Sequence, residues 1–249
     1  DSNIGHYANA DTPDEIKEAI GLDAQGIGLC RTEHLIIEDN LINLQTFFLT
    51  DSEETKHDAL IEFLTSHYNK FKQTYKLVGD MPLYVRLLDP PLSEFLPSPT
   101  EMSHIESLAS AMGDDPNKIK NKIAQLKSDD SMLGLRGCRL GIVYPELYDA
   151  QIRAIFSAAK DVSEETGKLI KPTIILPFVI NPDEVIHYKK RLDRISSQLG
   201  GIKYELGVMI ETPSALYEIP RIAEHASNLS IGTNDLTMLF FGISRNDNS

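Results

Sequence analysis

The stretch "GVMIETPSAL" (207–216) places a single carboxylate, Glu211, between the end of an apolar run and a proline that follows two residues later. The run that it closes, "ELGVMIE" (205–211), is too short for a helix and too continuous for a half-exposed strand. It therefore predicts a buried strand of a parallel sheet. Because "ETPSA" (211–215) is typical of a helix start, Glu211 stands where a strand ends and a helix begins. Ligands of parallel α/β sheets bind at that end of the strands.

Five further apolar runs have the same character, so six strands alternating with helices are predicted. These runs are "QGIGLC" (25–30), "PLYVRLLD" (82–89), "LGLRGCRL" (133–140), "KPTIILPFVI" (171–180) and "LSIG" (229–232). Such alternation implies a parallel sheet, which is either doubly wound or a (β/α)₈ barrel. Six strands are two fewer than a closed barrel needs. Either the sheet is open, or two further β/α units lie beyond residue 249.

Helix signals separate these runs. "TPDE" (12–15) and "NPDE" (181–184) each combine a capping residue, a proline at the first helical position and a glutamate that closes a capping box. The segment 145–167 has helical spacing of its apolar residues and stops at a glycine. Two inserts, at roughly 40–75 and 101–127, are predicted to be helical and not to form separate domains.

Composition and charge restrict the class of protein. A chain of 249 residues with 41% hydrophobic and 24% charged residues is long enough for one barrel, and no apolar run approaches the roughly 20 residues of a membrane span. A net charge of -13 argues against nucleic acid as a partner. Cys30 and Cys138 lie in apolar stretches without the spacing of a zinc site or a disulfide framework, and we expect a cytoplasmic protein.

Polar residues near the ends of the predicted strands should converge on one rim of the sheet. They are Arg31, Thr32, Glu33, His34, Arg86, Asp89, Arg136, Arg139, Glu211, Thr233, Asn234 and Asp235. Mg²⁺ is usually held by one or two protein carboxylates, and Glu211 and Asp235 suit that role. Arginines offer forked, permanently charged donors to phosphate or carboxylate groups. The implied ligand is small and multiply anionic.

Simpler interpretations exist for each residue alone. A glutamate at a strand end, such as Glu211, is more often a helix-capping or surface residue than a metal ligand. "GTND" (232–235) is by itself a turn signal. The histidines, His34 included, have no catalytic or metal-like spacing, and we expect both cysteines to be packing residues. Arg86 is harder to dismiss, because an unpaired guanidinium inside an apolar run is costly.

Five motifs in order carry a family resemblance: "GIGLCRTEH", "RLLDPPLSEFLP", "LRGCRLGIVYPEL", "MIETPSAL" and "SIGTNDLT" with the later "FGISR". Together they resemble the phosphoenolpyruvate/pyruvate-binding domain of the pyruvate, phosphate dikinases, a branch of the enzymes that use phosphoenolpyruvate. Phosphoenolpyruvate synthase and the first enzyme of the sugar phosphotransferase system share "RTE"-like and "GTND" motifs, whereas "DPPLSEFLP" and "RGCRLG" favour the dikinases. The match extends over roughly residues 8–247.

The resemblance implies a (β/α)₈ barrel that is incomplete at the C-terminus, with about six of eight β/α units over residues 1–249. It also implies a Mg²⁺-dependent, reversible transfer of a phosphoryl group from a phosphohistidine on a separate domain to pyruvate enolate. Arg31 and Arg86 would hold the phosphoryl group, and Arg136 would also reach the substrate. Glu211 and Asp235 would ligate Mg²⁺. The residues expected to line the substrate are Gly232, Thr233 and Asn234.

Other parts of such an enzyme are expected outside this sequence. The nucleotide-binding and phosphohistidine domains would precede it, and the cysteine that protonates the enolate would follow residue 249, so we expect no such catalytic residue within the chain. The chain as given is expected to bind substrate without turnover. Two further hypotheses remain: a non-catalytic dimerisation module, since this domain forms homodimers in the family, and another metal-dependent enolate barrel such as a pyruvate kinase or a citrate-lyase-like enzyme.

Overall fold

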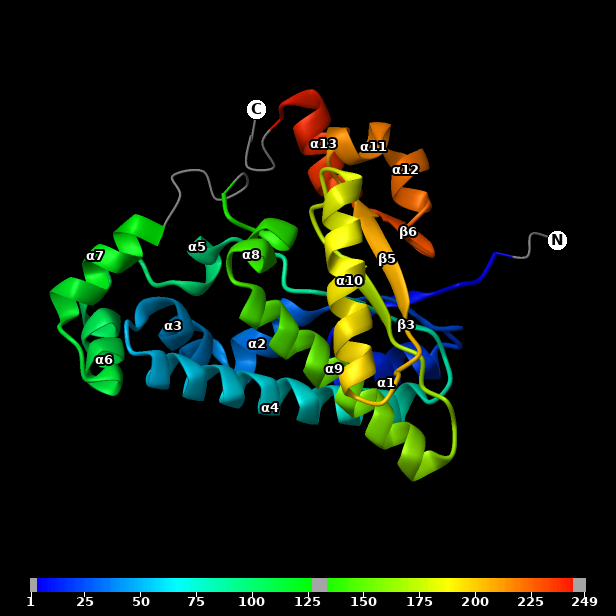
Figure 1. Ribbon diagram of the computed structural model, residues 1–249, viewed down its shortest axis with the longest axis horizontal. Coiled ribbons are helices and arrows are strands. Elements are labelled where there is room, and N and C mark those ends of the chain that lie inside the picture. The colour runs from blue at the N-terminus through cyan, green and yellow to red at the C-terminus, as the bar shows by residue number, and fades with distance from the viewer. Residues whose placement is uncertain (1–3, 127–133, 244–249) are drawn as a thin grey trace.

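A computed structural model describes residues 4–126 and 134–243 of the chain (Figure 1). Six strands alternate with helices in these two ranges, and all six belong to one sheet. The strands are β1 (Ala8–Asn9), β2 (Ile27–Arg31), β3 (Leu83–Arg86), β4 (Thr173–Leu176), β5 (Glu205–Ile210) and β6 (Asn228–Ile231).

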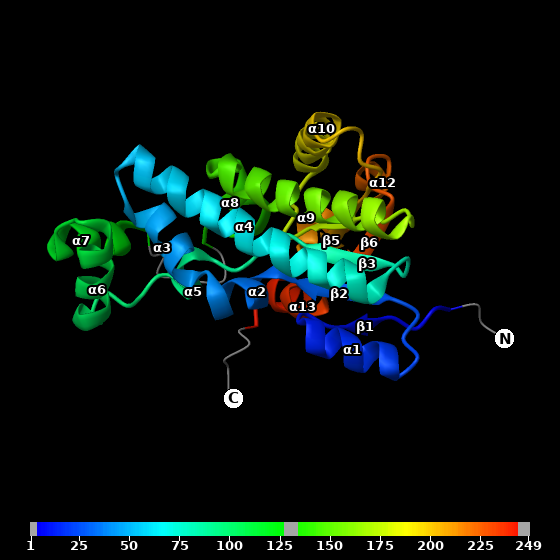
Figure 2. The ribbon, with the colours of Figure 1, turned by 90° about the horizontal axis from the view of Figure 1, so that it is seen from below.

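The order of the strands decides between the two candidate architectures. Neighbours in the sheet are β1-β2-β3-β4-β5-β6, and every pair is parallel. A doubly wound sheet reverses its strand order at a switch point, whereas a barrel wall runs in chain order. No reversal occurs among the described strands, which form a curled half-barrel (Figure 2). The expected incomplete α/β barrel is therefore confirmed.

Helices surround this sheet, and the longest two pack against each other. Helix α4 lies along α9 on the outside of the half-barrel, and α6 and α7 extend to one side of the molecule (Figures 1 and 2). The helices are α1 (Pro13–Gly21), α2 (Thr32–Asp39), α3 (Leu41–Leu49), α4 (Glu53–Val78), α5 (Leu92–Phe95), α6 (Met102–Met112), α7 (Pro116–Leu126), α8 (Gly137–Val143), α9 (Pro145–Thr166), α10 (Pro182–Gln198), α11 (Pro213–Tyr217), α12 (Ile219–Ala223) and α13 (Thr233–Phe241). Among the described helices, none combines the length and the hydropathy needed to cross a membrane.

Local signals fix several helix ends as the sequence predicts. Both capping boxes form, at the starts of α1 and α10. Helix α9 ends at Gly167, which has a φ of +70° that suits glycine at a helix terminus. The inserts at 40–75 and 101–127 are helical over most of their described length.

The predicted strand at 133–140 is wrong. Residues Gly137–Val143 form helix α8, and residue 133 lies outside the described ranges. The buried residues of α8 recur with helical spacing, and a short apolar run of this length cannot be assigned to strand or helix by periodicity alone. The sixth strand is instead β1, whose two residues are too few to give an apolar run.

A buried hydrogen-bond network fixes the segment that follows β3. The backbone N–H of Leu88 donates to Gln151 Oε1 at 3.0 Å, and the Tyr148 hydroxyl donates to the Leu88 carbonyl. The N–H of Gly137 donates to the Asp89 carbonyl at 2.9 Å. Because Gln151 and Tyr148 both lie on α9, that helix sets where Asp89 leaves the sheet and faces the rim.

Candidate functional site

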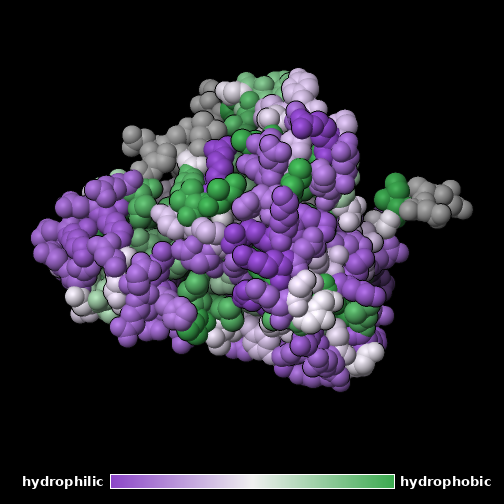
Figure 3. Space-filling view, in the orientation of Figure 1, coloured by the Kyte–Doolittle hydropathy of each residue, from purple (hydrophilic) through white to green (hydrophobic). Residues whose placement is uncertain are grey.

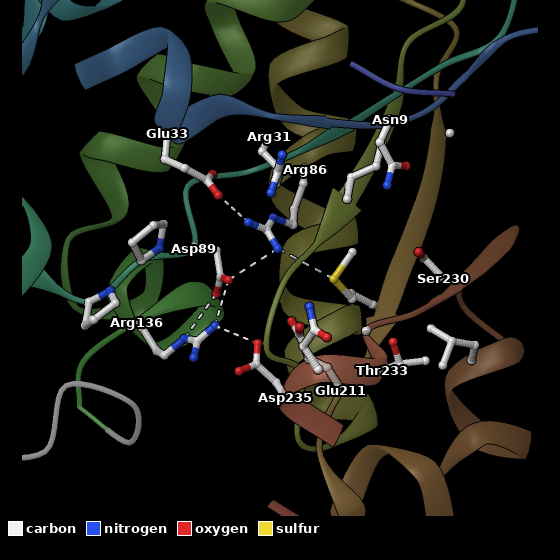
Figure 4. A pocket seen from close by; sticks show the side chains of 18 of the residues that line it. Asn9, Arg31, Glu33, Arg86, Asp89, Arg136, Glu211, Ser230, Thr233 and Asp235 are labelled. Carbon is white, nitrogen blue, oxygen red and sulfur yellow. Dashed lines mark hydrogen bonds and ion pairs between the residues drawn. The ribbon is translucent and has the colours of Figure 1, made fainter. Parts of the chain in front are cut away.

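A cavity of about 490 Å³ opens at the carboxyl ends of β2, β3, β5 and β6. All eight residues that the sequence analysis assigns to a site line this cavity, and Figure 4 shows the side chains of five of them, Arg31, Arg86, Arg136, Glu211 and Asp235, converging from different elements. The eight are Arg31, Arg86, Arg136, Glu211, Gly232, Thr233, Asn234 and Asp235. The structure thus brings the predicted residues together; their roles in binding stay predictions.

Three buried carboxylates form the centre of the site. Asp89, Glu211 and Asp235 each offer an oxygen, and these atoms all lie within 4.8 Å of one another. They come from the loop after β3, the residue after β5 and the first turn of α13. The sequence places Asp89 on the rim but does not assign it to the metal, so the structure adds it to the candidate ligands.

Two arginines contact two of these carboxylates, those of Asp89 and Asp235. Arg136 donates from Nη2 to Asp89 Oδ2 at 2.7 Å and to Asp235 Oδ2 at 3.2 Å. Arg86 Nη1 lies 3.4 Å from Asp89 Oδ2, and its Nη2 donates to Glu33. Burial by itself lowers the pKa of Arg136, but the carboxylates of Asp89 and Asp235 more than offset it and raise that pKa. Both guanidinium groups therefore stay charged.

Glu211 is the most buried of the three carboxylates, and its environment favours the protonated form. Its pKa is raised to about 8, first by burial and then by the charge of Asp89, and the hydrogen bond from the Phe178 N–H acts in the opposite direction. That N–H donates to Glu211 Oε1 at 2.6 Å. Phe178 has a φ of +55°, a strained value for a bulky residue, and its ring lies 4.2 Å from the Arg136 guanidinium. One strained residue thus contacts both the acidic and the basic side of the site.

The donor set fits a hard divalent cation. The cavity is lined by five carboxylates, those of Glu33, Asp89, Glu94, Glu211 and Asp235, and by three arginines, so ionised side chains leave an excess of negative charge. Asp235 Oδ1 is buried without a hydrogen-bond partner among the described residues. Such an orphaned oxygen is costly unless something pairs with it. Mg²⁺ in proteins is usually held by one or two carboxylates, with water and substrate oxygens as its other ligands.

Gly232 leaves the space that the Glu211 carboxylate fills. A Cβ at position 232 would lie 2.6 Å from Glu211 Oε2 and 2.7 Å from Glu211 Cβ. The φ of Gly232 is -86°, so an alanine there would be strained by contact and not by its backbone.

Gly232→Ala is therefore expected to displace Glu211 and to weaken Mg²⁺ binding by about tenfold or more, at a stability cost of about 1–3 kcal/mol from overpacking. Titration calorimetry with Mg²⁺ and thermal unfolding measure the two effects. Gly21→Ala is the control, because a Cβ at position 21 meets nothing within 4 Å. Unchanged Mg²⁺ affinity in Gly232→Ala would contradict the assignment of Glu211 as a Mg²⁺ ligand.

Other residues named in the sequence analysis lie around the cavity in supporting positions. Glu33 lines it and pairs with Arg86, and Arg139 lies with its guanidinium 5.0 Å from the Phe178 ring. Both cysteines are buried, and burial raises the pKa of each thiol, in agreement with a packing role. Asp11 pairs with Arg31, and no sequence signal points to it, because the two-residue strand before it gives no apolar run.

Comparison with known proteins agrees with the geometry. The family model described as "PEP-utilising enzyme, PEP-binding domain" matches residues 2–249. The chain is 42% identical over 245 residues to pyruvate, phosphate dikinase of Clostridium symbiosum, covering 96% of this chain and 28% of that protein. It is 40% identical to the dikinase of Rhizobium meliloti (strain 1021) and 39% identical to that of Giardia intestinalis, in each case over 96% of this chain and 27% of the relative.

The chain thus spans little more than a quarter of the length of these relatives. Its own match to the family model is nearly complete, and the half-barrel and its rim agree with that match. The chain belongs to the family of PEP-utilising enzymes and corresponds to their PEP-binding domain.

Proposed function

We propose that this chain binds phosphoenolpyruvate and pyruvate together with Mg²⁺, as the substrate-binding part of a pyruvate, phosphate dikinase. In this proposal a phosphohistidine of a separate domain exchanges its phosphoryl group reversibly with pyruvate enolate bound here. The relatives reported above are dikinases, which favours this branch over phosphoenolpyruvate synthase and the phosphotransferase-system enzyme.

The eight residues predicted from the sequence each have a part in the proposal. Arg31 and Arg86 would hold the phosphoryl group, and Arg136 would reach the substrate while holding Asp89 and Asp235. The backbone of Gly232 and Thr233 and the amide of Asn234 would line the substrate. Glu211 and Asp235, with Asp89 in reach, would hold the metal. When bound, Mg²⁺ would offset the negative charge of the phosphoryl and enolate oxygens.

One observation carries the proposal: three arginines and three clustered carboxylates meet in a single cavity, although they are scattered over the sequence from residue 31 to residue 235. Titration calorimetry with phosphoenolpyruvate, and with oxalate as an enolate mimic, tests it in the presence and absence of Mg²⁺. Binding of both ligands is expected only with Mg²⁺. Absence of Mg²⁺-dependent heat from either ligand would contradict the proposal.

The remaining parts of the reaction are assigned to a longer parent chain. We infer that residues 1–249 form one barrel domain, and that the nucleotide-binding domain, the phosphohistidine domain and the cysteine that protonates the enolate belong to other segments. The cytoplasm is the compartment that the cysteine usage favours.

Self-association is the second candidate function. Apolar side chains are exposed on the last described helix and the strand before it, including Phe241, Phe240 and Ile231, which are 68%, 49% and 54% exposed. The hydrophobic surface at the top of Figure 3 lies over the last described helix, α13. Exposed apolar side chains that lie near one another favour contact with another protein, here a second copy. Light scattering that gives a monomer mass at micromolar concentration would contradict a homodimer.

A further inference from the structure

Two arginines of the cavity stand next to each other on neighbouring strands. Arg31 of β2 and Arg86 of β3 are Cα partners in the sheet, and both line the cavity (Figure 4). Like charges in adjacent positions repel each other. Arg86 is buried and is held by Glu33 and Asp89, whereas the Arg31 side chain is 43% exposed. Something must therefore keep Arg31 over the cavity.

Asp11 provides that restraint. It follows β1, and its side chain is only 5% exposed. Its Oδ2 accepts from Arg31 Nε at 2.9 Å and lies 2.7 Å from Arg31 Nη2, so the carboxylate grips one edge of the guanidinium. Its Oδ1 accepts from the Arg31 backbone N–H at 2.7 Å. Both oxygens of one buried carboxylate thus hold a single residue.

Asp11 is itself held from the other side. Its backbone N–H donates to Glu15 Oε2 at 2.7 Å, and Glu15 also closes the capping box of α1. The start of α1 therefore fixes the backbone that carries the carboxylate. His34 Nε2 lies 3.6 Å from Asp11 Oδ2, at a greater distance than Arg31.

We propose that Asp11 is a positioning residue for the phosphoryl group of the ligand and acts through Arg31. Since Asp11 binds the edge formed by Nε and Nη2, the N–H groups of Nη1 are left for a ligand, beside the guanidinium of Arg86. Two arginines oriented in this way form a double fork for a dianionic phosphoryl group. Without Asp11, repulsion from Arg86 and contact with water draw Arg31 away from the cavity.

This inference rests on the proposed function, and Asp11→Asn separates it from a purely structural role. The Asn side-chain oxygen still accepts from the Arg31 backbone N–H, so the contact between the segment after β1 and β2 is kept. The Asn amide nitrogen, however, donates and cannot accept from the guanidinium. The substitution thus releases the side chain of Arg31 and leaves the local backbone contact in place.

The test compares a ligand that has a phosphoryl group with one that lacks it. Titration calorimetry is performed with Mg²⁺ at pH 8. In Asp11→Asn, the affinity for phosphoenolpyruvate is expected to fall by about tenfold or more, while the affinity for oxalate changes by less than about threefold. Arg31→Met and the double variant Asp11→Asn/Arg31→Met should lose the same amount of phosphoenolpyruvate affinity, because Asp11 acts only through Arg31.

Asp14→Asn is the matched control, since Asp14 is an exposed acid of the same helix start that pairs with Lys17 at 3.0 Å. It is expected to bind both ligands as the unmodified chain does. Three results would overturn the inference: unchanged phosphoenolpyruvate affinity in Asp11→Asn, equal losses for phosphoenolpyruvate and oxalate, or additive losses in the double variant. If the unmodified chain binds neither ligand, the proposed function fails and the inference fails with it.

Discussion

Glu211→Gln is expected to make the metal-free protein more stable at pH 8 and to remove its response to Mg²⁺. In the folded protein the pKa of Glu211 is raised to about 8, first by burial and then by the charge of Asp89, from an ordinary value of 4.5. Below pH 4.5 the carboxyl is protonated in both the folded and the unfolded chain. As the pH rises towards 8, the unfolded chain ionises first, so the group contributes progressively less to folding stability.

The size of the effect follows from the same linkage. Each pH unit between 4.5 and 8 removes up to about 1.4 kcal/mol of the free energy of unfolding, and a glutamine does not titrate. The variant should therefore be more stable than the unmodified chain by about 3 kcal/mol at pH 8, relative to their difference at pH 5. Urea unfolding at the two pH values measures this difference.

With Mg²⁺ at pH 8, the unmodified chain should become more stable than Glu211→Gln. A metal ligand must be deprotonated, so Mg²⁺ binding to the unmodified chain releases a proton and stabilises the fold, whereas Glu211→Gln has lost a charged ligand. Glu205→Gln is the matched control, because Glu205 lies at the opposite end of β5 and pairs with the exposed Lys171. A variant at position 211 that keeps the Mg²⁺-induced rise in melting temperature would contradict the assignment of Glu211.

The convergence of the rim was predictable because it depends on one regularity. Carboxyl ends of parallel strands meet at one edge, so Arg31, Arg86 and Glu211 could be placed together from the ends of their apolar runs alone. Chain order in the sheet could not be read from those runs. The resemblance supplied the barrel, and the strand pairing confirms it.

The wrong prediction of a strand at 133–140 has a physical cause. The backbone of the run that includes Arg136 turns into a helix at Gly137, which has a φ of +55°. Without a side chain, Gly137 can lie close to Phe178 and Pro177. A Cβ at position 137 would lie 2.6 Å from Phe178 Cβ, a tertiary constraint that no local pattern reveals. Arg136 thus reaches the cavity as the N-cap residue of α8 and not from a strand.

Asp11 and Asp89 show a second limit of the sequence. The sequence places Asp89 on the rim, but its closeness to Glu211 and Asp235 depends on the path of the chain after β3. Hydrogen bonds from α9 set that path. Asp11 follows a strand of two residues. Partners of this kind become visible only when the three-dimensional neighbours of each arginine are known.

Arg136→Met is expected to destabilise the metal-free protein by about 3–5 kcal/mol at pH 8, because it removes a buried charge, leaves Asp235 without its cation and leaves Asp89 with Arg86 alone. Arg136 contacts Asp89 at 2.7 Å and Asp235 at 3.2 Å, and its own side chain is 5% exposed. Methionine keeps an apolar stem but has no donors, and it lacks the guanidinium that lies over the Phe178 ring. The matched control is Arg194→Met, because the Arg194 side chain is 52% exposed and pairs with Asp149; a loss of less than about 1 kcal/mol is expected.

Arg136→Met should also affect the affinity for Mg²⁺ and the affinity for phosphoenolpyruvate differently. Without Arg136, the three clustered carboxylates lose a competing cation, so Mg²⁺ affinity is expected to stay equal or to rise, and saturating Mg²⁺ should restore part of the lost stability. Affinity for phosphoenolpyruvate in the presence of Mg²⁺ should nevertheless fall by about tenfold or more, because a forked donor to the ligand is gone. Calorimetric titrations with Mg²⁺ alone, and then with phosphoenolpyruvate, measure the two constants. If both affinities fall together in Arg136→Met, this arginine supports the metal cluster and does not contact the substrate, and its assigned role is wrong.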